Sequence, residues 1–469
     1  MQAAQSVLLE EYIDEFTTLF GDRRSRATFA AILSGILAAG SLVCSRIAAV
    51  APLLSKVCDG AQRVLRFASG ESTRRSEVQG ASLAQRLVGS LAQRGVASLG
   101  QTSGGTEIWL VLDGSDLRKP HAREMADLMK VRSLQGTMVN GYRTLNVLAV
   151  TPQHRALLYH RLFSSKEKDH LSESHEVQTA LTQVGMALLP IQEEHPVSWI
   201  MDSGFDDVAV WRTVWEQGEH VLCRAKHMDR LVQYKTLLNE WHGGYLRQAE
   251  VHLRAQGKVQ TSMVVRLKGQ RYEKRQPVTV QLSSCPIKVS YEPDVRRVGP
   301  AKGEGAKVTQ SMWLLKVEVV DSRMEPWYLL TDWPAATPSG AARLFQMYRQ
   351  RWSVEEAFQF LKTCVGWEEV QVLDLEGVRT LVVLGWVAAG FLYEIDGGWE
   401  WADVELLAKL GGYVSHKGRK PGKKILLWGL QRVQDYMVTE AILRQHKATT
   451  GSIPPGVAAL LGKDIVDQL

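Results

Sequence analysis

Apolar residues recur at helical spacing through the first block of the chain, which ends near residue 98. They fall three or four residues apart, as they do along one face of a helix. The pattern is clear in LEEYIDEFTTLF, in ATFAAILSGILAA and in the repeated Leu and Arg of SLAQRLVGSLAQRG. We therefore predict that residues 1–98 form a helical N-terminal domain.

The pattern changes near residue 105, where short apolar runs and alternating runs replace the helical spacing. EIWLVLD and VSWIMD have the continuous apolar character of buried strands, and YRTLNVLAVTP alternates like a strand beside a neighbour. Helical stretches are interleaved with the strands in the order β-β-β-α-β-α-β. This order predicts a mixed α/β sheet layered with helices over residues 99–244.

Short strands separated by polar loops predict a β-rich insertion over residues 245–338. The helical pattern returns at residues 339–395, which complete the core, and residues 396–469 are predicted to form a helical C-terminal region with a basic loop, HKGRKPGKK. Two apolar runs, at residues 29–44 and 380–393, are shorter than the roughly 20 residues that a membrane span needs. Because both are rich in Ala and Gly, we expect buried helices and no membrane partner.

The composition is that of an ordinary globular protein, with 45% apolar and 23% charged residues. The 56 basic and 50 acidic residues leave a net charge of +6, which permits a nucleic-acid partner without proving one. The five cysteines are far apart and form no C-x-x-C pair, which argues against a disulfide framework or a zinc knuckle and fits a reducing cytosol. The acidic start of the chain lacks the features of a signal peptide.

Arginines cluster in parts of the N-terminal block, and they have two interpretations. They are either the solvated face of ordinary helices or the surface of a DNA-binding domain. The residues concerned are Arg23, Arg24, Arg26, Arg63, Arg66, Arg74 and Arg75.

Polar residues stand at regular intervals in one helical stretch, YRQRWSVEEAFQFLK. At about 100° per residue, Tyr348, Arg351, Glu355 and Lys362 fall within one strip about 60° wide. That strip borders the apolar face of the same predicted helix, which is formed by Met347, Val354, Phe358 and Leu361. A single carboxylate with cations and a phenol on either side suits a polyanion lying along the helix, with a metal at its middle.

Two further carboxylates are predicted at the ends of buried strands, Asp113 after EIWLVL and Asp202 after VSWIM. Taken alone, each of these residues is more simply interpreted as an Asp in a turn. Together with Glu355 they would repel one another, and divalent cations remove that penalty. An all-oxygen ligand set favours Mg²⁺ or Mn²⁺ over zinc. Other acids close to these positions in the sequence are Asp116, Asp206, Asp207 and Glu356.

The spacing Tyr-x2-Arg-x3-Glu-x6-Lys resembles the YREK signature of bacterial insertion-sequence transposases of the DDE type, the IS-four family. VLDGSD and IMDSGFDD look like the segments that carry the first and second Asp of that family, and the resemblance covers residues 105–395. It implies a ribonuclease-H-like catalytic core interrupted by a β-rich insertion. It also implies that Asp113, Asp202 and Glu355 bind two Mg²⁺ ions per active site, with Mn²⁺ able to substitute.

The same resemblance implies a function. The enzyme would cut transposon ends at their terminal inverted repeats and join them to target DNA by two-metal phosphoryl transfer, in a cut-and-paste reaction that passes through a DNA hairpin. The partners would be double-stranded DNA and a second copy of the chain, as a homodimer in the synaptic complex. The expected location is the bacterial cytoplasm, in association with the nucleoid.

Several DNA contacts follow from the resemblance. Tyr348, Arg351 and Lys362 would hold phosphates on either side of the scissile one. Trp327 would stack on a base flipped out of the transposon end, although by pattern alone it is a core residue, as is Trp333. The strand VLCRAKH adds two basic candidates, Arg224 and Lys226, whereas Ser203 stands where the family often has an Arg.

Two other functions are compatible with the residues. A catalytically inactive DNA-binding relative acting as a repressor would be expected to have an altered triad, and here the triad is intact. A carboxylate-based polysaccharide hydrolase would use paired acids, but it leaves the strip of Tyr, Arg and Lys unexplained. The sequence therefore favours the transposase.

Overall fold

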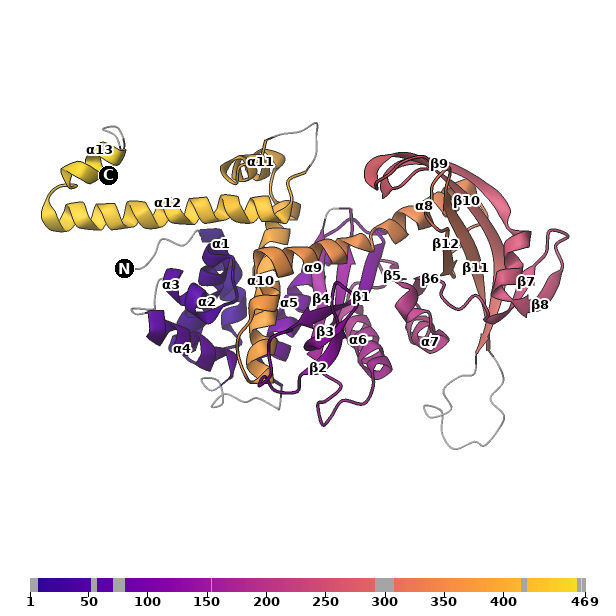
Figure 1. Cartoon of the computed structure of the whole chain (residues 1–469), viewed down its shortest axis with the longest axis horizontal. Helices are drawn as coiled ribbons and strands as arrows, with labels where there is room; N and C mark the ends of the chain where they lie inside the picture. The colour runs from indigo at the N-terminus through magenta and orange to yellow at the C-terminus, as the bar shows by residue number, and fades with distance from the viewer. Residues whose placement is uncertain are drawn as a thin grey trace.

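The structure, a computed structural model, arranges a helical body, a long sheet and a projecting helical arm along one axis (Figure 1). It describes residues 7–51, 57–70, 81–152, 154–291, 308–414, 420–461 and 465. Arg74, Arg75 and the first part of the basic loop, residues 416–419, lie outside the described residues.

The described part of the N-terminal block contains five helices: α1 (Val7–Thr17), α2 (Arg23–Ala39), α3 (Cys44–Val50), α4 (Val57–Ala68) and α5 (Leu83–Gly100). Ser82 begins α5 with a reciprocal pair of hydrogen bonds to Gln85, which satisfies backbone N–H groups of the first turn. The block packs around α10 (Leu375–Gly398), to which the buried Tyr12 hydroxyl donates a 2.6 Å hydrogen bond at the carbonyl of Val387. In the described part of the block, the prediction of helices is confirmed.

The first half of the sheet carries the mixed α/β order that the sequence predicts. Its strands are β1 (Ile108–Arg118), β2 (Met129–Arg132), β3 (Met138–Val150), β4 (Arg155–Phe163), β5 (Val197–Met201) and β6 (His220–Arg224). Strands β1, β5 and β6 run parallel, whereas β2, β3 and β4 pair antiparallel. The helices α6 (Glu173–Leu188) and α7 (Val208–Glu216) connect the later strands.

The second half of the sheet is continuous with the first, because β12 hydrogen-bonds to β6. Its strands are β7 (Leu231–Lys235), β8 (Trp241–Tyr245), β9 (Arg254–Val265), β10 (Lys274–Tyr291), β11 (Val308–Val319) and β12 (Trp327–Thr331). PVTVQL and IKVSY, predicted as two strands, form the single strand β10. Pro277 and Pro286 each remove one N–H from it, but Ser262 and Trp313 still stand opposite them in register.

Helices cover both faces of the sheet. On one face, Leu110 and Trp199 pack in a core with α6 and α7. On the other face, Val111 and Ile200 belong to a second core that includes α10, α8 (Pro338–Arg349) and α9 (Trp352–Cys364). Figure 1 shows α8 and α9 crossing this face in succession. Tyr348, Glu355 and Lys362 lie on these two helices, whereas Asp113 comes from β1 and Asp202 follows β5.

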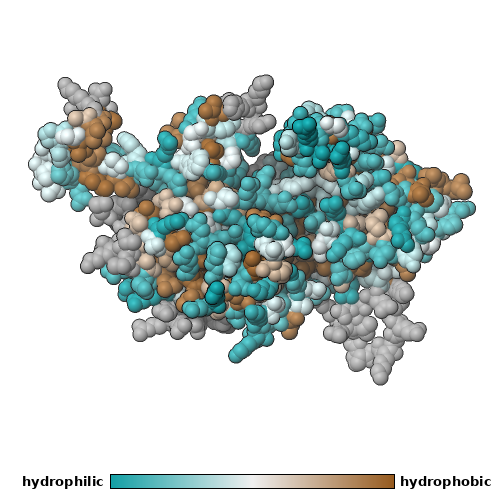
Figure 2. Space-filling view, in the orientation of Figure 1, coloured by the Kyte–Doolittle hydropathy of each residue, from teal (hydrophilic) through white to brown (hydrophobic). Residues whose placement is uncertain are grey.

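The C-terminal region contains α11 (Trp401–Leu410), α12 (Lys423–Thr450) and α13 (Pro455–Leu461), and α12 projects beyond the body. Figure 2 shows hydrophobic side chains gathered on that projecting arm. Among the described residues, α10 is long and apolar enough to cross a membrane, with 78% of its most apolar window buried in the fold, and α2 with α3 passes the same test only as a pair bent by 96°. The two apolar runs are therefore buried helices, as predicted.

Candidate active site

Asp113 and Asp202 lie side by side on neighbouring parallel strands. The pairing of β1 with β5 extends to Leu112 opposite Met201, and each Asp is the next residue. The prediction that Asp113 ends its strand is wrong, because β1 continues to Arg118 in its pairing with β3. Asp113 instead stands where β1 loses its parallel neighbour, which opens the sheet edge around its side chain.

The predicted continuous helix from residue 348 to residue 362 is broken in two. α8 ends at Arg349, α9 begins at Trp352, and the backbone N–H of Arg351 bonds the carbonyl of Tyr348 three residues back, at 3.1 Å. The N–H of Ser353 likewise bonds the carbonyl of Gln350, at 2.8 Å. These tighter turns bend the chain. The polar residues therefore do not lie along one continuous helix, because Tyr348 precedes the break and Glu355 and Lys362 follow it.

Arg351 lies among the three acids. Its Nη1 is 2.6 Å from Oε1 of Glu355 and 3.5 Å from Oδ2 of Asp113. Its side chain is only 11% exposed. Burial acts to lower the pKa of Arg351, but the surrounding anions, Glu355 first among them and Asp202 included, raise it overall. The guanidinium therefore stays charged and is the cation that these carboxylates share.

Asp113 is the acid whose titration is most altered. Burial is the main cause that raises its pKa to about 7, and the charges of Asp202 and Glu355 act in the same direction. Arg351 opposes the shift, as does the 2.8 Å hydrogen bond that the Gly114 N–H donates to Oδ1. A proton and a cation therefore compete for this carboxylate near neutral pH.

The side chain of Tyr348 is buried and contacts Asp202. Its side chain is 2% exposed, and its hydroxyl donates a 3.4 Å hydrogen bond to Oδ1 of Asp202. Burial, reinforced by Asp202, raises the pKa of Tyr348, so the hydroxyl keeps its proton. In this structure Tyr348 orients an acid, whereas the sequence predicts that it contacts a phosphate.

Lys362 is also held inside the protein. Its Nζ donates a 2.9 Å hydrogen bond to the carbonyl of Asp116 and lies 3.5 Å from Oε1 of Glu368. Burial lowers the pKa of Lys362. Of the two other predicted cations, Arg224 is half-buried at the end of β6 and Lys226 is exposed beyond it. Their roles toward DNA stay predictions.

The other nearby acids have structural tasks. The buried Asp206 accepts hydrogen bonds from the backbone N–H groups of Lys226 and His227 and pairs with Arg230 at 2.6 Å. Asp207 begins α7 by accepting from a backbone N–H in its first turn. Asp206 and Asp207 are therefore held by structural contacts that the sequence alone does not show.

Asp116 and Glu356 are also engaged away from the three acids. Asp116 accepts a hydrogen bond from the backbone N–H of Arg132 at 3.2 Å. Glu356 lies 3.8 Å from Arg155, beyond the first turn of α9. Neither side chain shares the contacts of Arg351.

Trp327 is a core residue that also lines a cavity. It is 5% exposed, meets Tyr348 edge-on at a centroid distance of 5.5 Å and lies 5.3 Å from the ring of Trp352. It helps line a cavity of about 700 Å³, together with Trp352, Glu355 and Arg349. Trp333 lies elsewhere, where its indole N–H donates to Ser198 Oγ at 2.8 Å.

Sequence reasoning missed Trp352. Its position beside Arg351 was the available signal, but nothing in the pattern distinguished it from a core aromatic. The bend between α8 and α9 is what places it in the cavity with Trp327 and Glu355.

Asp113, Asp202 and Glu355 have the oxygen atoms that a hard cation prefers, but in this structure their side chains are not grouped as the ligands of a metal ion. Among the described residues, no three His, Cys, Asp or Glu side chains are grouped closely enough to hold a metal ion. Asp113 and Glu355 contact the Arg351 guanidinium instead, and Asp202 lies within reach of its charge. All three offer oxygen atoms, which Mg²⁺ and Mn²⁺ prefer. A divalent ion at this place would therefore have to compete with Arg351.

Comparison with known protein families gives a match over the central part of the chain. The family model for the transposase DDE domain matches residues 107–389, a span that contains Asp113, Asp202 and Glu355. No curated protein matches the chain significantly. Among solved structures, the chain is similar to the cryo-EM structure of piggyBac transposase in a synaptic complex with hairpin DNA, at 8% sequence identity and a TM-score of 0.34. That alignment covers 74% of this chain and 56% of that one, and the likeness is too slight to transfer any residue's role.

Proposed function

This chain belongs to the transposase DDE domain family, and on that basis we propose that it is a DNA transposase that cuts transposon ends and joins them to target DNA. The observation that carries the proposal is the convergence on Arg351 of acids from three separate segments, Asp113, Asp202 and Glu355. All three lie inside the span that the family model matches. The three acids come from distant parts of the sequence and meet around one largely buried cation only in the folded chain.

The finer assignment is to the bacterial IS-four family, with a ribonuclease-H-like core. The strand order β4-β3-β1-β5-β6, with β1, β5 and β6 parallel and β3 and β4 antiparallel, supports that core. The spacing of Tyr348, Arg351, Glu355 and Lys362 supports the family. The corresponding location is the bacterial cytoplasm, at the nucleoid.

Asp113, Asp202 and Glu355 are the residues that would hold Mg²⁺ or Mn²⁺, two ions in each site. When bound, such ions activate a water and stabilise charge on the attacking and leaving oxygens. The chain's own groups then have distinct tasks. Asp113 gives up its proton near neutral pH, and the Tyr348 hydroxyl orients Asp202. Arg351, once displaced from the carboxylates, is available to pair with a phosphate through its planar fork.

Second-strand cleavage through a DNA hairpin would need a place for an unstacked base. The cavity of about 700 Å³ beside Glu355 supports such a place, because Trp327 and Trp352 both line it. Base–aromatic stacking is worth about 1–3 kcal/mol, comparable with the cost of flipping a base. Arg275 and Arg349 line the same cavity and would meet the flanking phosphates.

The partners are double-stranded DNA, at the terminal inverted repeats and at the target, and a second copy of the chain. Exposed apolar side chains on the projecting arm, such as Trp428, Ile442 and Leu460, support self-association as a homodimer in the synaptic complex. Sedimentation with and without DNA tests this, since a chain that stays monomeric on DNA would contradict it.

A plasmid nicking assay tests the function. With Mg²⁺ the wild-type protein should nick DNA and leave 3′-hydroxyl ends, and EDTA should stop it. Asp113→Ala and Asp202→Ala should bind DNA as the wild type does, because many phosphate contacts support binding, and should not cut. Binding without cutting by the wild type would favour a repressor. Hydrolysis of a polysaccharide without DNA cleavage would favour the hydrolase.

A further inference from the structure

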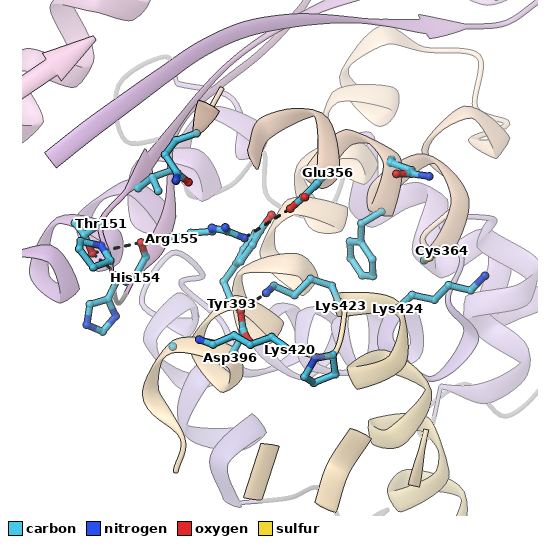
Figure 3. A pocket seen from close by; sticks show the side chains of 18 of the residues that line it. Thr151, His154, Arg155, Glu356, Cys364, Tyr393, Asp396, Lys420, Lys423 and Lys424 are labelled. Atoms are coloured by element: carbon cyan, nitrogen blue, oxygen red, sulfur yellow. Dashed lines mark hydrogen bonds and ion pairs between the residues drawn. The ribbon is translucent and has the colours of Figure 1, made fainter. Parts of the chain in front are cut away.

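A second cavity, of about 940 Å³, extends along α9 from Gln350 to Cys364. Figure 3 shows its walls. They come from β1, from the connection between β3 and β4, from α9, from the end of α10 and from the first turn of α12. Its lysines belong to the basic loop HKGRKPGKK, but the sequence did not indicate which segments surround that loop.

This cavity adjoins the one that contains Glu355. Gln350, Glu356 and Gln359 line both cavities. The two cavities therefore share part of a wall along α9 and lie next to each other.

The strand β1 gives the distance between the larger cavity and Asp113. Trp109, which lines the larger cavity, lies four residues before Asp113 on the same strand, and so on the same face of the sheet. The separation along the strand is about 13 Å. That length corresponds to roughly four nucleotides of one strand in a duplex, at ~3.4 Å of axis per phosphate.

The cavity carries more positive than negative charge. Its described lining has four cations, Arg155, Lys420, Lys423 and Lys424, and two carboxylates, those of Glu356 and Asp396. The carboxylates are already paired, because Lys423 contacts Asp396 and Arg155 lies 3.8 Å from Glu356. Among the described residues, the exposed Lys420 and Lys424 have no acidic partner. Lys424 Nζ lies 4.7 Å from the centre of the Trp428 ring, a contact that does not neutralise its charge, so two positive charges remain for a ligand.

Two further groups in the cavity favour an anion. Tyr393 is 8% exposed and lines the cavity, and its hydroxyl makes no hydrogen bond to another described residue. The first turn of α12 has no side-chain cap and no acid, and begins with Lys423 and Lys424. The positive end of the helix dipole and two lysines repel one another there, and a bound anion would relieve that repulsion.

We propose that this cavity binds the phosphodiester backbone of the DNA beyond the cleaved bond, first the donor flank and later the target. The inference rests on the proposed function for the identity of the two strands. The cavity lined by Trp327 would take the transposon end. The adjoining cavity, lined by Tyr393, would then take the DNA on the other side of the cleaved bond. After the flank leaves, the target strand must present its own phosphate to the same acids, and it occupies the same basic surface.

Lys420→Ala/Lys424→Ala tests the charge contribution in the full-length chain. Fluorescence anisotropy with a labelled duplex, over a range of salt concentrations, gives the slope of log K against log salt. Loss of two phosphate contacts should reduce the magnitude of that slope by about 1.8. The matched control, Arg432→Ala/Lys447→Ala, removes two cations from α12 outside the cavity and should leave the slope unchanged. Equal slopes for the wild type and the lysine variant would overturn the proposal.

Tyr393→Phe tests the cavity wall itself. The substitution removes only a hydroxyl that lacks a described partner, so the melting temperature should not fall. Affinity for the duplex should weaken about tenfold, the size of one hydrogen bond to a charged group. Unchanged affinity would mean that the hydroxyl does not meet DNA and would count against the site.

A pair of duplexes identifies the strand. Both carry the terminal sequence from the DNA beside the gene, but one stops at the cleavage site and the other continues into the flank. The wild type should bind the longer duplex more tightly, and Lys420→Ala/Lys424→Ala should remove that difference. A variant that keeps the difference would place the flank elsewhere. If Lys420→Ala/Lys424→Ala reduces the slope and removes the flank preference, but the wild type never cuts DNA with Mg²⁺, the proposed function fails and the binding site stands.

Discussion

Replacing Arg351 with Gln removes the cation around which the three acids are arranged. The variant keeps a polar, hydrogen-bonding side chain, although a shorter one, and the main electrostatic change is the loss of one positive charge from a largely buried place. Asp113, 17% exposed, then has no cationic partner within 4 Å among the described residues. We expect the free energy of unfolding at pH 8 to fall markedly and divalent metal to restore part of it.

The size of the effect follows from the distances. At 3.5 Å, the attraction between Arg351 and Asp113 is about 5 kcal/mol at an effective dielectric constant of about 20. The cost of burying the guanidinium offsets much of this, and Glu355, at 46% exposed, adds about 1 kcal/mol or less because water screens it. A net loss of about 2–4 kcal/mol at pH 8 is therefore expected. At pH 5 the loss should be smaller, because a carboxyl with a pKa near 7 then carries a proton.

Chemical denaturation at pH 5 and pH 8, with and without Mn²⁺, measures this directly. Mn²⁺ should stabilise Arg351→Gln more than the wild type, since the ion no longer competes with a guanidinium. The control is Arg349→Gln, whose side chain contacts Thr261 and the carbonyl of Ser262 and no acid. If Arg351→Gln is as stable as the wild type at pH 8, or gains no more from Mn²⁺ than Arg349→Gln does, the shared-cation interpretation is wrong.

The remaining predictions concern the metal, the hairpin and a buried acid. Mn²⁺ should raise the melting temperature of the wild type, and Asp113→Asn/Asp202→Asn should remove that rise; an unchanged rise would place the metal elsewhere. Trp327→Ala should leave nicking largely intact and slow hairpin formation about tenfold or more, as followed on labelled ends, whereas Trp333→Ala should act only on stability. Burial raises the pKa of Glu219 to about 7, so its contribution to stability is full below the unfolded pKa near 4.5 and is lost as the pH rises through 7. Glu219→Gln should therefore match the wild type in denaturation at pH 5 and exceed it by up to about 3 kcal/mol at pH 8.

The sequence located the acids because their surroundings are simple. VSWIM is fully buried, so the pattern predicts a strand that ends at Met201. Asp202, the next residue, is then predicted at the edge of the sheet. The run before Asp113 is equally clear, but its continuation to Arg118 was not, because GSDLR has no apolar alternation. That part of β1 is held by its pairing with β3, a contact that local pattern does not record.

The bend at Gln350 and Arg351 could not have been predicted, since neither residue breaks a helix by its own chemistry. Contacts from distant segments decide it: Arg351 turns to Asp113 on β1, and Trp352 packs on Trp327 of β12. The same bend explains why Tyr348 meets Asp202 instead of lying in the strip expected from a straight helix. The cavity around Tyr393 was equally hidden, because its walls come together only in the folded chain.

The central claim is tested most directly by single-turnover cleavage of an end duplex in Mg²⁺, with protein in excess and DNA fully bound. Glu355→Gln removes one acid from the proposed site. Asp116→Asn alters a nearby acid that accepts a hydrogen bond from the Arg132 N–H at 3.2 Å and lies 3.9 Å from Arg143. The account predicts cleavage at the background rate for Glu355→Gln and at close to the wild-type rate for Asp116→Asn. Cleavage by Glu355→Gln at the wild-type rate, or no cleavage by a wild-type protein that binds the duplex, would contradict it.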